Sequence, residues 1–112
     1  MDIFFYLEMK MKNEILIKQL EETISSYNDV MSCINENCEY TYSTVELINF
    51  YNDLCEDCEY QIKQINIMNK SNDTIIYEKC KHNFITDIID INLDKSMTIC
   101  YCTICELTKR KD

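Results

Sequence analysis

The chain has 112 residues, a length that allows one domain with at most a small appendage. Its 20 acidic residues outnumber the 11 basic ones, and the net charge of −9 argues against a general nucleic-acid-binding protein. Glycine and proline are absent, which excludes a glycine-rich phosphate-binding loop and leaves turns and helix ends to Asn, Asp and Ser.

A first helix is predicted from about residue 2 to residue 35. Its apolar residues recur at spacings of three and four, which is typical of one face of a helix. This seam comprises Ile17, Leu20, Ile24, Tyr27, Met31, Ile34 and Cys38. The helix is expected to stop at Asn35-Glu36-Asn37, because asparagine tolerates the left-handed backbone that often ends helices.

A second helix is predicted from about residue 44 to residue 68. Ser43 and Glu46 have the spacing of a capping box, in which two side chains bond each other's backbone N–H groups. The apolar seam of this helix comprises Ile48, Tyr51, Cys55, Cys58, Ile62 and Ile65. The polar run 69–73 is expected to end it. A short loop between two helices predicts that they lie antiparallel.

The remaining residues change to the pattern of a β-hairpin. Residues 74–77 are rich in types that favour strands. Residues 84–91 and 97–101 predict two strands, joined by a turn at residues 92–95. The expected cross-strand pairs are Ile88 with Ile99 and Thr86 with Tyr101.

Together these elements predict an α+β fold with two domains. Residues 1–72 are expected to form an acidic, coiled-coil-like antiparallel helical hairpin. Residues 73–112 are expected to form a small β-hairpin module similar to a zinc ribbon. Charge is divided in the same way: residues 1–60 contain 13 acidic and 3 basic residues, whereas residues 61–112 contain 7 and 8. The helical part therefore carries nearly all of the acidity.

Four candidate metal ligands flank the predicted hairpin. Cys80 and His82 precede its first strand, while Cys102 and Cys105 follow its second strand after nineteen intervening residues. Thiols and imidazole in closely spaced pairs are the ligands that Zn²⁺ prefers, and His82 is the only histidine of the chain. The alternative is a thiol-rich hairpin in which the histidine occurs by chance. Four protein ligands complete a tetrahedron, which indicates a structural zinc rather than a catalytic one.

A family resemblance covers residues 80–108. The segments that carry it are Cys80-Lys81-His82-Asn83-Phe84-Ile85-Thr86-Asp87-Ile88-Ile89-Asp90-Ile91, Leu93-Asp94-Lys95-Ser96 and Ile99-Cys100-Tyr101-Cys102-Thr103-Ile104-Cys105-Glu106. They resemble the tail of short zinc-binding proteins of large nucleocytoplasmic DNA viruses of the mimivirus and iridovirus kind. Leu93 stands where that family usually has a proline. The resemblance implies a viral source and the same four ligands. It gives no indication of a particular biochemical activity.

Four further cysteines form a second set, Cys33, Cys38, Cys55 and Cys58. Three interpretations remain open for them: thiols in the helical core, a second zinc site, or disulfides across the helices. Helical seams favour the first, because a buried thiol behaves as a small apolar side chain. A hairpin that turns near residue 40 also keeps the two cysteine pairs apart. Cys100 is expected to be a spare thiol on the hairpin.

The expected function is binding rather than catalysis. With His82 committed to metal, no general base remains for a cysteine nucleophile, so we predict no catalytic residues and no enzyme. The predicted role is a zinc-binding structural or protein-interaction protein that associates with itself or with another protein through its helices. The alternative is a nucleic-acid-associated factor that uses the zinc module and the basic tail 109–111.

The expected location is an intracellular reducing compartment, which for a viral protein means host cytoplasm or virion. In such a compartment the eight cysteines are expected to be metal ligands or free thiols in preference to disulfides. The apolar run 3–7 is too short for the core of a signal peptide. We therefore expect no membrane association.

Overall fold

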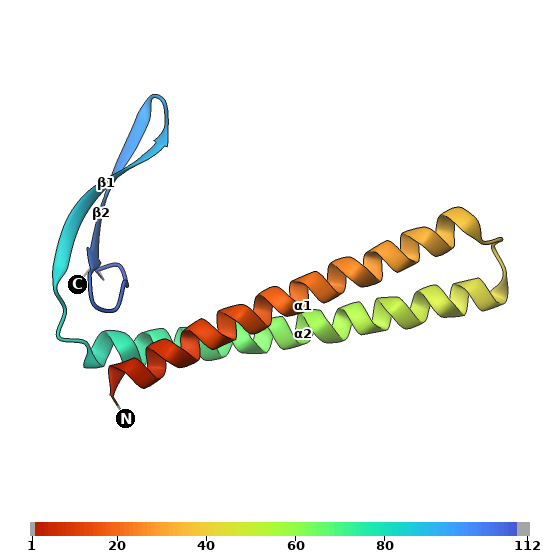
Figure 1. Ribbon diagram of the computed structural model, residues 1–112, viewed down its shortest axis with the longest axis horizontal. Helices are drawn as coiled ribbons and strands as arrows, with labels where there is room; N and C mark the ends of the chain where they lie inside the picture. Colours follow the sequence, from red (N-terminus) through yellow and green to blue (C-terminus); the bar gives the residue numbers. More distant parts are fainter. Residues whose placement is uncertain (1, 110–112) are drawn as a thin grey trace. The chain divides into compact units, whose positions relative to one another are not determined.

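The structure is a computed structural model that describes residues 2–109. Helix α1 (Ile3–Asn37) and helix α2 (Tyr42–Lys79) pack against each other, and strands β1 (Phe84–Asn92) and β2 (Lys95–Cys102) form an antiparallel hairpin. Figure 1 shows the two helices side by side, joined by a short loop. The predicted α+β class, with a helical hairpin followed by a β-hairpin, is confirmed.

Two compact units make up the chain. One combines Met1–Lys10 with Lys70–Asp112, and the other is Met11–Asn69. The first unit therefore contains the beginning of α1, the end of α2 and the whole β-hairpin. The domain division after residue 72 stays a prediction, although helix α2 runs through it without a break.

Helix α1 begins at a side-chain cap. The Asp2 carboxylate accepts hydrogen bonds from the backbone N–H groups of Phe4 (3.0 Å) and Phe5 (3.2 Å), which have no partner within the helix. The predicted seam is half-buried or buried from Ile17 to Ile34, and the helix ends at Asn37 inside the expected stop. The prediction was wrong for Cys38, which is exposed beyond the end of the helix.

Helix α2 begins two residues earlier than predicted. Thr41 and Thr44 form the reciprocal cap: the Thr41 N–H donates to Thr44 Oγ1 (2.8 Å), and the Thr44 N–H donates to Thr41 Oγ1 (3.3 Å). The predicted capping box of Ser43 and Glu46 is therefore wrong, since both residues already lie inside the helix. Either cap satisfies N–H groups at the helix start, and the threonine pair stands two residues closer to Asn37.

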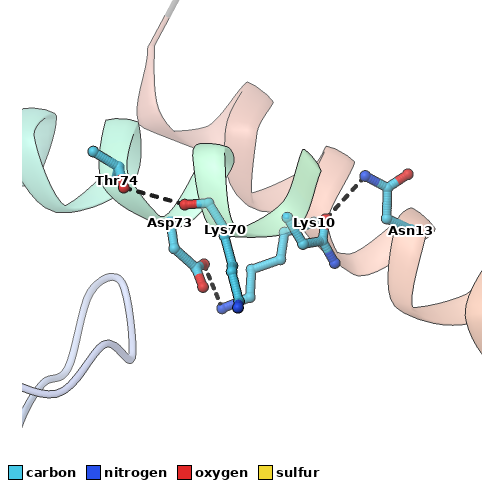
Figure 2. Close-up of polar contacts among 6 residues, drawn as sticks. Lys10, Asn13, Lys70, Asp73 and Thr74 are labelled. Atoms are coloured by element: carbon cyan, nitrogen blue, oxygen red, sulfur yellow. Dashed lines mark hydrogen bonds and ion pairs between the residues drawn. The ribbon is translucent and has the colours of Figure 1, made fainter. Parts of the chain in front are cut away.

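Helix α2 also continues past its predicted end at residue 68 and stops at Lys79, eleven residues later. The added residues include types that favour turns and strands. Two polar side chains of the run 69–73, those of Asn69 and Asp73, have partners on α1. Asp73 pairs with Lys10 of α1 at 2.8 Å, and the Thr74 hydroxyl donates to the Lys70 carbonyl at 3.2 Å. Figure 2 shows both contacts. In the other unit, the Asn13 amide donates to Asn69 Oδ1 at 2.9 Å.

Burial explains why the strand-favouring run 74–77 is helical. Ile76 is fully buried, and Asn69, Asn72, Ile76 and Cys80 follow each other at spacings of three and four on the buried side. A helix brings this face inward as one stripe, whereas a strand would send Ile76 and Tyr77 to opposite sides. Tertiary packing therefore outweighs the local strand preference.

Asn72 supplies a stability prediction. Its side chain is 4 % exposed, and its Nδ2 has no hydrogen-bond partner among residues 2–109. A buried unsatisfied amide costs about 1–3 kcal/mol. Asn72→Leu is therefore expected to raise the free energy of unfolding by about that amount and the melting temperature by roughly 4–8 °C per kcal/mol. Thermal denaturation measures this, with the exposed Asn52→Leu as matched control; a melting temperature lowered by Asn72→Leu alone would contradict it.

The β-hairpin turns where predicted but pairs in a different register. Asn92 lies opposite Lys95, as a turn at 92–95 requires. A β-bulge between Asp90 and Asn92 then adds one residue to β1. The observed pairs are Ile88 with Thr98, Thr86 with Cys100 and Ile85 with Tyr101. The predicted pairs were therefore wrong by one residue, a shift that exchanges which β1 and β2 side chains share a face.

Candidate metal centre

The centre lies in the apolar core of the unit that contains the hairpin. Its buried members are Ile76, Cys80, Cys102 and Cys105. The partly buried side chains that pack against them are Ile3, Tyr6, Leu7, Phe84 and Leu107. The first turns of α1, the last turns of α2 and the base of the hairpin thus share one cluster, and three candidate ligands are part of it.

Each candidate ligand is placed by an ordered piece of backbone. Cys80 follows α2 directly, with its N–H still bonded to the Ile76 carbonyl at 2.9 Å. His82 lies in the link to β1, Cys102 is the last residue of β2, and Cys105 is in the turn that follows. The four ligand atoms all lie within 4.8 Å of one another. The sequence-predicted residues are therefore brought together, in an arrangement that could hold a metal ion.

Two of the separations between ligand atoms match the edges of a tetrahedral zinc site. The Sγ atoms of Cys80 and Cys102 are 3.7 Å apart, and Cys105 Sγ lies 3.7 Å from His82 Nδ1. Zinc–sulfur bonds of about 2.3 Å and zinc–nitrogen bonds of about 2.0–2.1 Å imply tetrahedral edges of about 3.8 Å and 3.6 Å. No rearrangement beyond a few tenths of an ångström is needed at these two edges.

The imidazole of His82 is oriented for ligation through Nδ1. Its Nε2 lies 2.8 Å from the Tyr77 carbonyl oxygen, which can only accept, so Nε2 carries the proton in the neutral ring. The Nδ1 lone pair then faces Cys105 and the centre of the cluster. The ring also stacks on Phe84 and contacts the ring of Tyr77, with centroid distances of 4.7 and 4.6 Å. A metal-binding histidine commonly has its second nitrogen fixed in this way.

Cys102 is surrounded by donors that favour its thiolate. Its Sγ accepts hydrogen bonds from the N–H groups of Asn83 and Ile104, each at 3.3 Å. Burial by itself raises the pKa of this thiol. Backbone N–H donors, first that of Cys105, outweigh burial and lower the pKa to about 5. At neutral pH this sulfur is therefore already in the form that binds metal.

Cys80 has the opposite environment. Burial, followed by hydrogen bonds to the sulfurs of Cys102 and Cys105, raises the pKa of its thiol to about 12. A buried thiolate beside a second thiolate is unfavourable without a cation to compensate. A divalent metal between the sulfurs would supply that compensation and release the Cys80 proton.

The turn after β2 is fixed on both sides. The Glu106 N–H donates to the Cys102 carbonyl (2.9 Å), and the Cys102 N–H donates to the Leu107 carbonyl (3.0 Å). Glu106 has φ of 64°, a left-handed conformation that a chain without glycine must adopt with another residue. Thr103 is joined to Asn83 by its N–H, which donates to the Asn83 carbonyl at 3.0 Å. The Cys-x-x-Cys segment is thereby anchored to the residue that follows His82.

Sequence reasoning missed the groups that support the ligands. These are the Tyr77 carbonyl, the Asn83 N–H and the stacked ring of Phe84. Two of the three are backbone atoms, which every residue carries, so no pattern of residue types identifies them. The aromatic positions Tyr77 and Phe84, close to the histidine on either side, were the only available signal.

The second set of cysteines divides into two pairs. Cys55 and Cys58 are buried in the helical core, as the thiol interpretation predicted, and burial raises the pKa of Cys55. Cys33 and Cys38 are exposed, and all four are free thiols. Across residues 2–109, the Cys80 cluster is the one group of metal-ligating side chains close enough to share an ion.

The basic tail lies mostly outside the described residues. Arg110 and Lys111 belong to the part that is not described, so their predicted role stays untested. Lys109 lies over the Phe84 ring, with Nζ 5.6 Å from the centroid. Within residues 2–109, neither helix contains a stretch apolar and long enough to cross a bilayer.

Comparisons of the chain with protein-family models, with curated proteins and with solved structures found no match. The candidate function therefore depends on the geometry of the centre and on the surfaces of the chain.

Proposed function

We propose that Cys80, His82, Cys102 and Cys105 bind one Zn²⁺, and that the protein is a non-enzymatic, zinc-stabilised interaction protein. The observation that carries the proposal is the convergence of three sulfurs and one imidazole nitrogen within 4.8 Å. The identity of the metal follows from the donors: thiolates and imidazole select zinc over the oxygen-preferring Mg²⁺ and Ca²⁺. Four protein ligands leave no position for water or substrate, which is the arrangement of a structural site.

The proposed zinc would hold the hairpin to the helix ends. A two-stranded hairpin is marginally stable by itself, and most side chains of β1 and β2 are exposed. A structural zinc contributes on the order of 10–16 kcal/mol in small zinc-binding peptides. One ion shared by Cys80, at the end of α2, and Cys102, at the end of β2, would join these elements at their base.

Binding to protein is the function that the remaining surface supports. Leu47 and Phe50 of α2 are 43 % and 56 % exposed, and the helices carry most of the acidic residues. Exposed apolar side chains on a helix that has one neighbour favour a further helix, and the helical hairpin of a second copy supplies one. We therefore propose self-association through the helices, in preference to nucleic-acid binding, which the net charge of −9 opposes.

Native mass spectrometry of protein purified without chelator tests both parts of this proposal. We expect one zinc per chain and a mass of twice 13.4 kDa or more at micromolar concentration. Replacement of zinc by Co²⁺ is expected to give the intense visible spectrum of a tetrahedral, thiolate-rich site. A chain that carries no metal would contradict the zinc site, and a strictly monomeric mass would contradict self-association through the helices.

A further inference from the structure

The two faces of the β-hairpin differ in polarity. In the observed register, one face carries the side chains of Ile85, Ile89, Asn92, Met97, Ile99 and Tyr101, with Asp87 and Lys95 as its charged members. We call these eight residues the apolar hairpin face. The opposite face carries Thr86, Ile88, Asp90, Ser96, Thr98 and Cys100. The bulge between Asp90 and Asn92 produces this separation, because it brings Ile89 opposite Met97.

Most of the apolar hairpin face is open to solvent. The side chains of Ile85 and Ile89 are each 39 % exposed, and that of Met97 is 45 % exposed. A sheet normally buries one face against another layer, and a two-stranded sheet with a bare apolar face is marginal in water. The face therefore requires a second layer.

The two charges of this face show what that layer can be. Asp87 lies opposite Ile99, and Lys95 lies opposite Asn92, four residue pairs further along the hairpin. At about 3.4 Å per residue they are about 14 Å apart, which is too far for an ion pair within one hairpin. The Asp87 carboxylate accepts a hydrogen bond from the Ile88 N–H at 2.8 Å. A purely apolar cover would nevertheless bury both charges without an oppositely charged partner, which is costly. The cover must therefore offer a cation near Asp87 and an anion near Lys95.

We propose that the apolar hairpin face packs against the same face of a second copy of this chain. A two-fold axis across the strands at Ile89 and Met97 lies midway between the Asp87 and Lys95 positions, so it brings Asp87 of each copy to the level of Lys95 of the other. With sheets about 10 Å apart and strands about 4.8 Å apart, a lysine side chain can reach the carboxylate diagonally. The contact is then self-complementary, because apolar side chains meet apolar side chains and opposite charges lie at the same level.

The size of the contact predicts a modest affinity. Two strands of eight or nine residues present a face of about 300 Å², so the pair buries roughly 600 Å². Stable interfaces bury about 1,200–2,000 Å². The hairpin contact alone is therefore expected to be weak and concentration-dependent. This proposal depends on the proposed zinc site only for the fold of the hairpin, and it is separate from association through the helices.

Carbodiimide cross-linking of the unaltered, zinc-loaded protein tests the geometry directly. The reagent joins a carboxylate to an amine in contact, and equal mixing of ¹⁴N- and ¹⁵N-labelled protein marks links between copies. We expect linked peptides that contain Asp87 from one isotope and Lys95 from the other. Links of Lys95 to carboxylates of its own chain serve as the internal control. Failure to find a mixed-isotope Asp87–Lys95 link in the cross-linked dimer would overturn the proposal.

Charge reversal tests the same pair by an independent measurement. Asp87→Lys and Lys95→Asp are each expected to raise the dissociation constant for self-association at least about tenfold, and the double variant is expected to restore it. Asp90→Lys on the opposite face is the matched control. It should leave association unchanged, or strengthen it by making the net charge of −9 less negative. Equal effects of Asp87→Lys and Asp90→Lys would overturn the proposal. Zinc content, measured for each variant, separates this outcome from failure of the metal site.

Discussion

Cys102→Ser is expected to abolish zinc binding and to unfold the β-hairpin. Cys102 is fully buried, lies 3.7 Å from Cys80 Sγ and accepts N–H hydrogen bonds from two backbone positions. A hydroxyl is a poor zinc ligand at neutral pH, so three ligands would remain. Loss of a structural zinc removes on the order of 10–16 kcal/mol, which exceeds the total stability of most domains. Amide NMR signals of residues 84–102 should collapse to unfolded positions.

Cys100→Ser is the matched control for this loss. Cys100 lies two residues earlier on the same strand and is half-buried, but its side chain is outside the four-ligand cluster. This variant should keep one zinc per chain and the dispersed hairpin signals. The helical signal of Met11–Asn69 should persist in Cys102→Ser, because that compact unit contains none of the four ligands. A hairpin that stays folded in metal-free Cys102→Ser would show that zinc is not what stabilises it.

The helices illustrate what residue patterns predict well. The spacing of Ile17, Ile24 and Ile34 gave the buried face of α1, because helical periodicity repeats over many turns. The end of α2 was predicted wrongly because Asn69 and Asn72 were interpreted as turn formers. In the structure they lie on the buried side, where Asn69 bonds Asn13, a residue 56 positions away. Partners so distant in the chain leave no local signal.

The candidate centre illustrates the same limit at a smaller scale. Cys80, His82, Cys102 and Cys105 were identified from residue type and spacing, and the structure brings their ligand atoms together. The pairing register of the strands between these ligands was not predicted, because the bulge next to Asp90 shifts it by one residue. That shift is what gathers Ile89 and Met97 on one face. The sequence therefore indicated the site, while the interaction face required the three-dimensional structure.

The fold and the centre depend on each other. Ile3, Tyr6 and Leu7 from α1 pack on the cluster that contains the sulfurs, so the first residues of the chain are part of the environment of the metal site. Burial of the thiols raises the cost of ionising them, and the N–H donors at Cys102 offset that cost at one sulfur. At the other sulfurs, a bound cation would offset the cost of ionising the thiol. We therefore expect zinc binding and packing of the hairpin on the helix ends to occur as one cooperative step.

Zinc is expected to leave the folded protein as the pH falls through about 5. Each sulfur must be ionised to bind, so protons compete with zinc, and the stability that the metal provides is present at neutral pH and lost on the acid side. N–H donors hold the pKa of Cys102 at about 5, well below the usual value of 9.0, so this sulfur stays available until that pH. Cys80, whose pKa burial raises to about 12, depends on the metal for its ionisation throughout.

An acid titration of the zinc-loaded protein measures this release. A zinc-sensitive dye reports the free metal, and NMR of residues 84–102 reports the hairpin; the two transitions should coincide near pH 5 and reverse on neutralisation with zinc present. Cd²⁺ serves as the matched comparison, because it binds thiolates more tightly and should be released at a lower pH. Zinc release centred near pH 7 would contradict the predicted midpoint. A hairpin that outlasts the metal would contradict the coupling between zinc and fold.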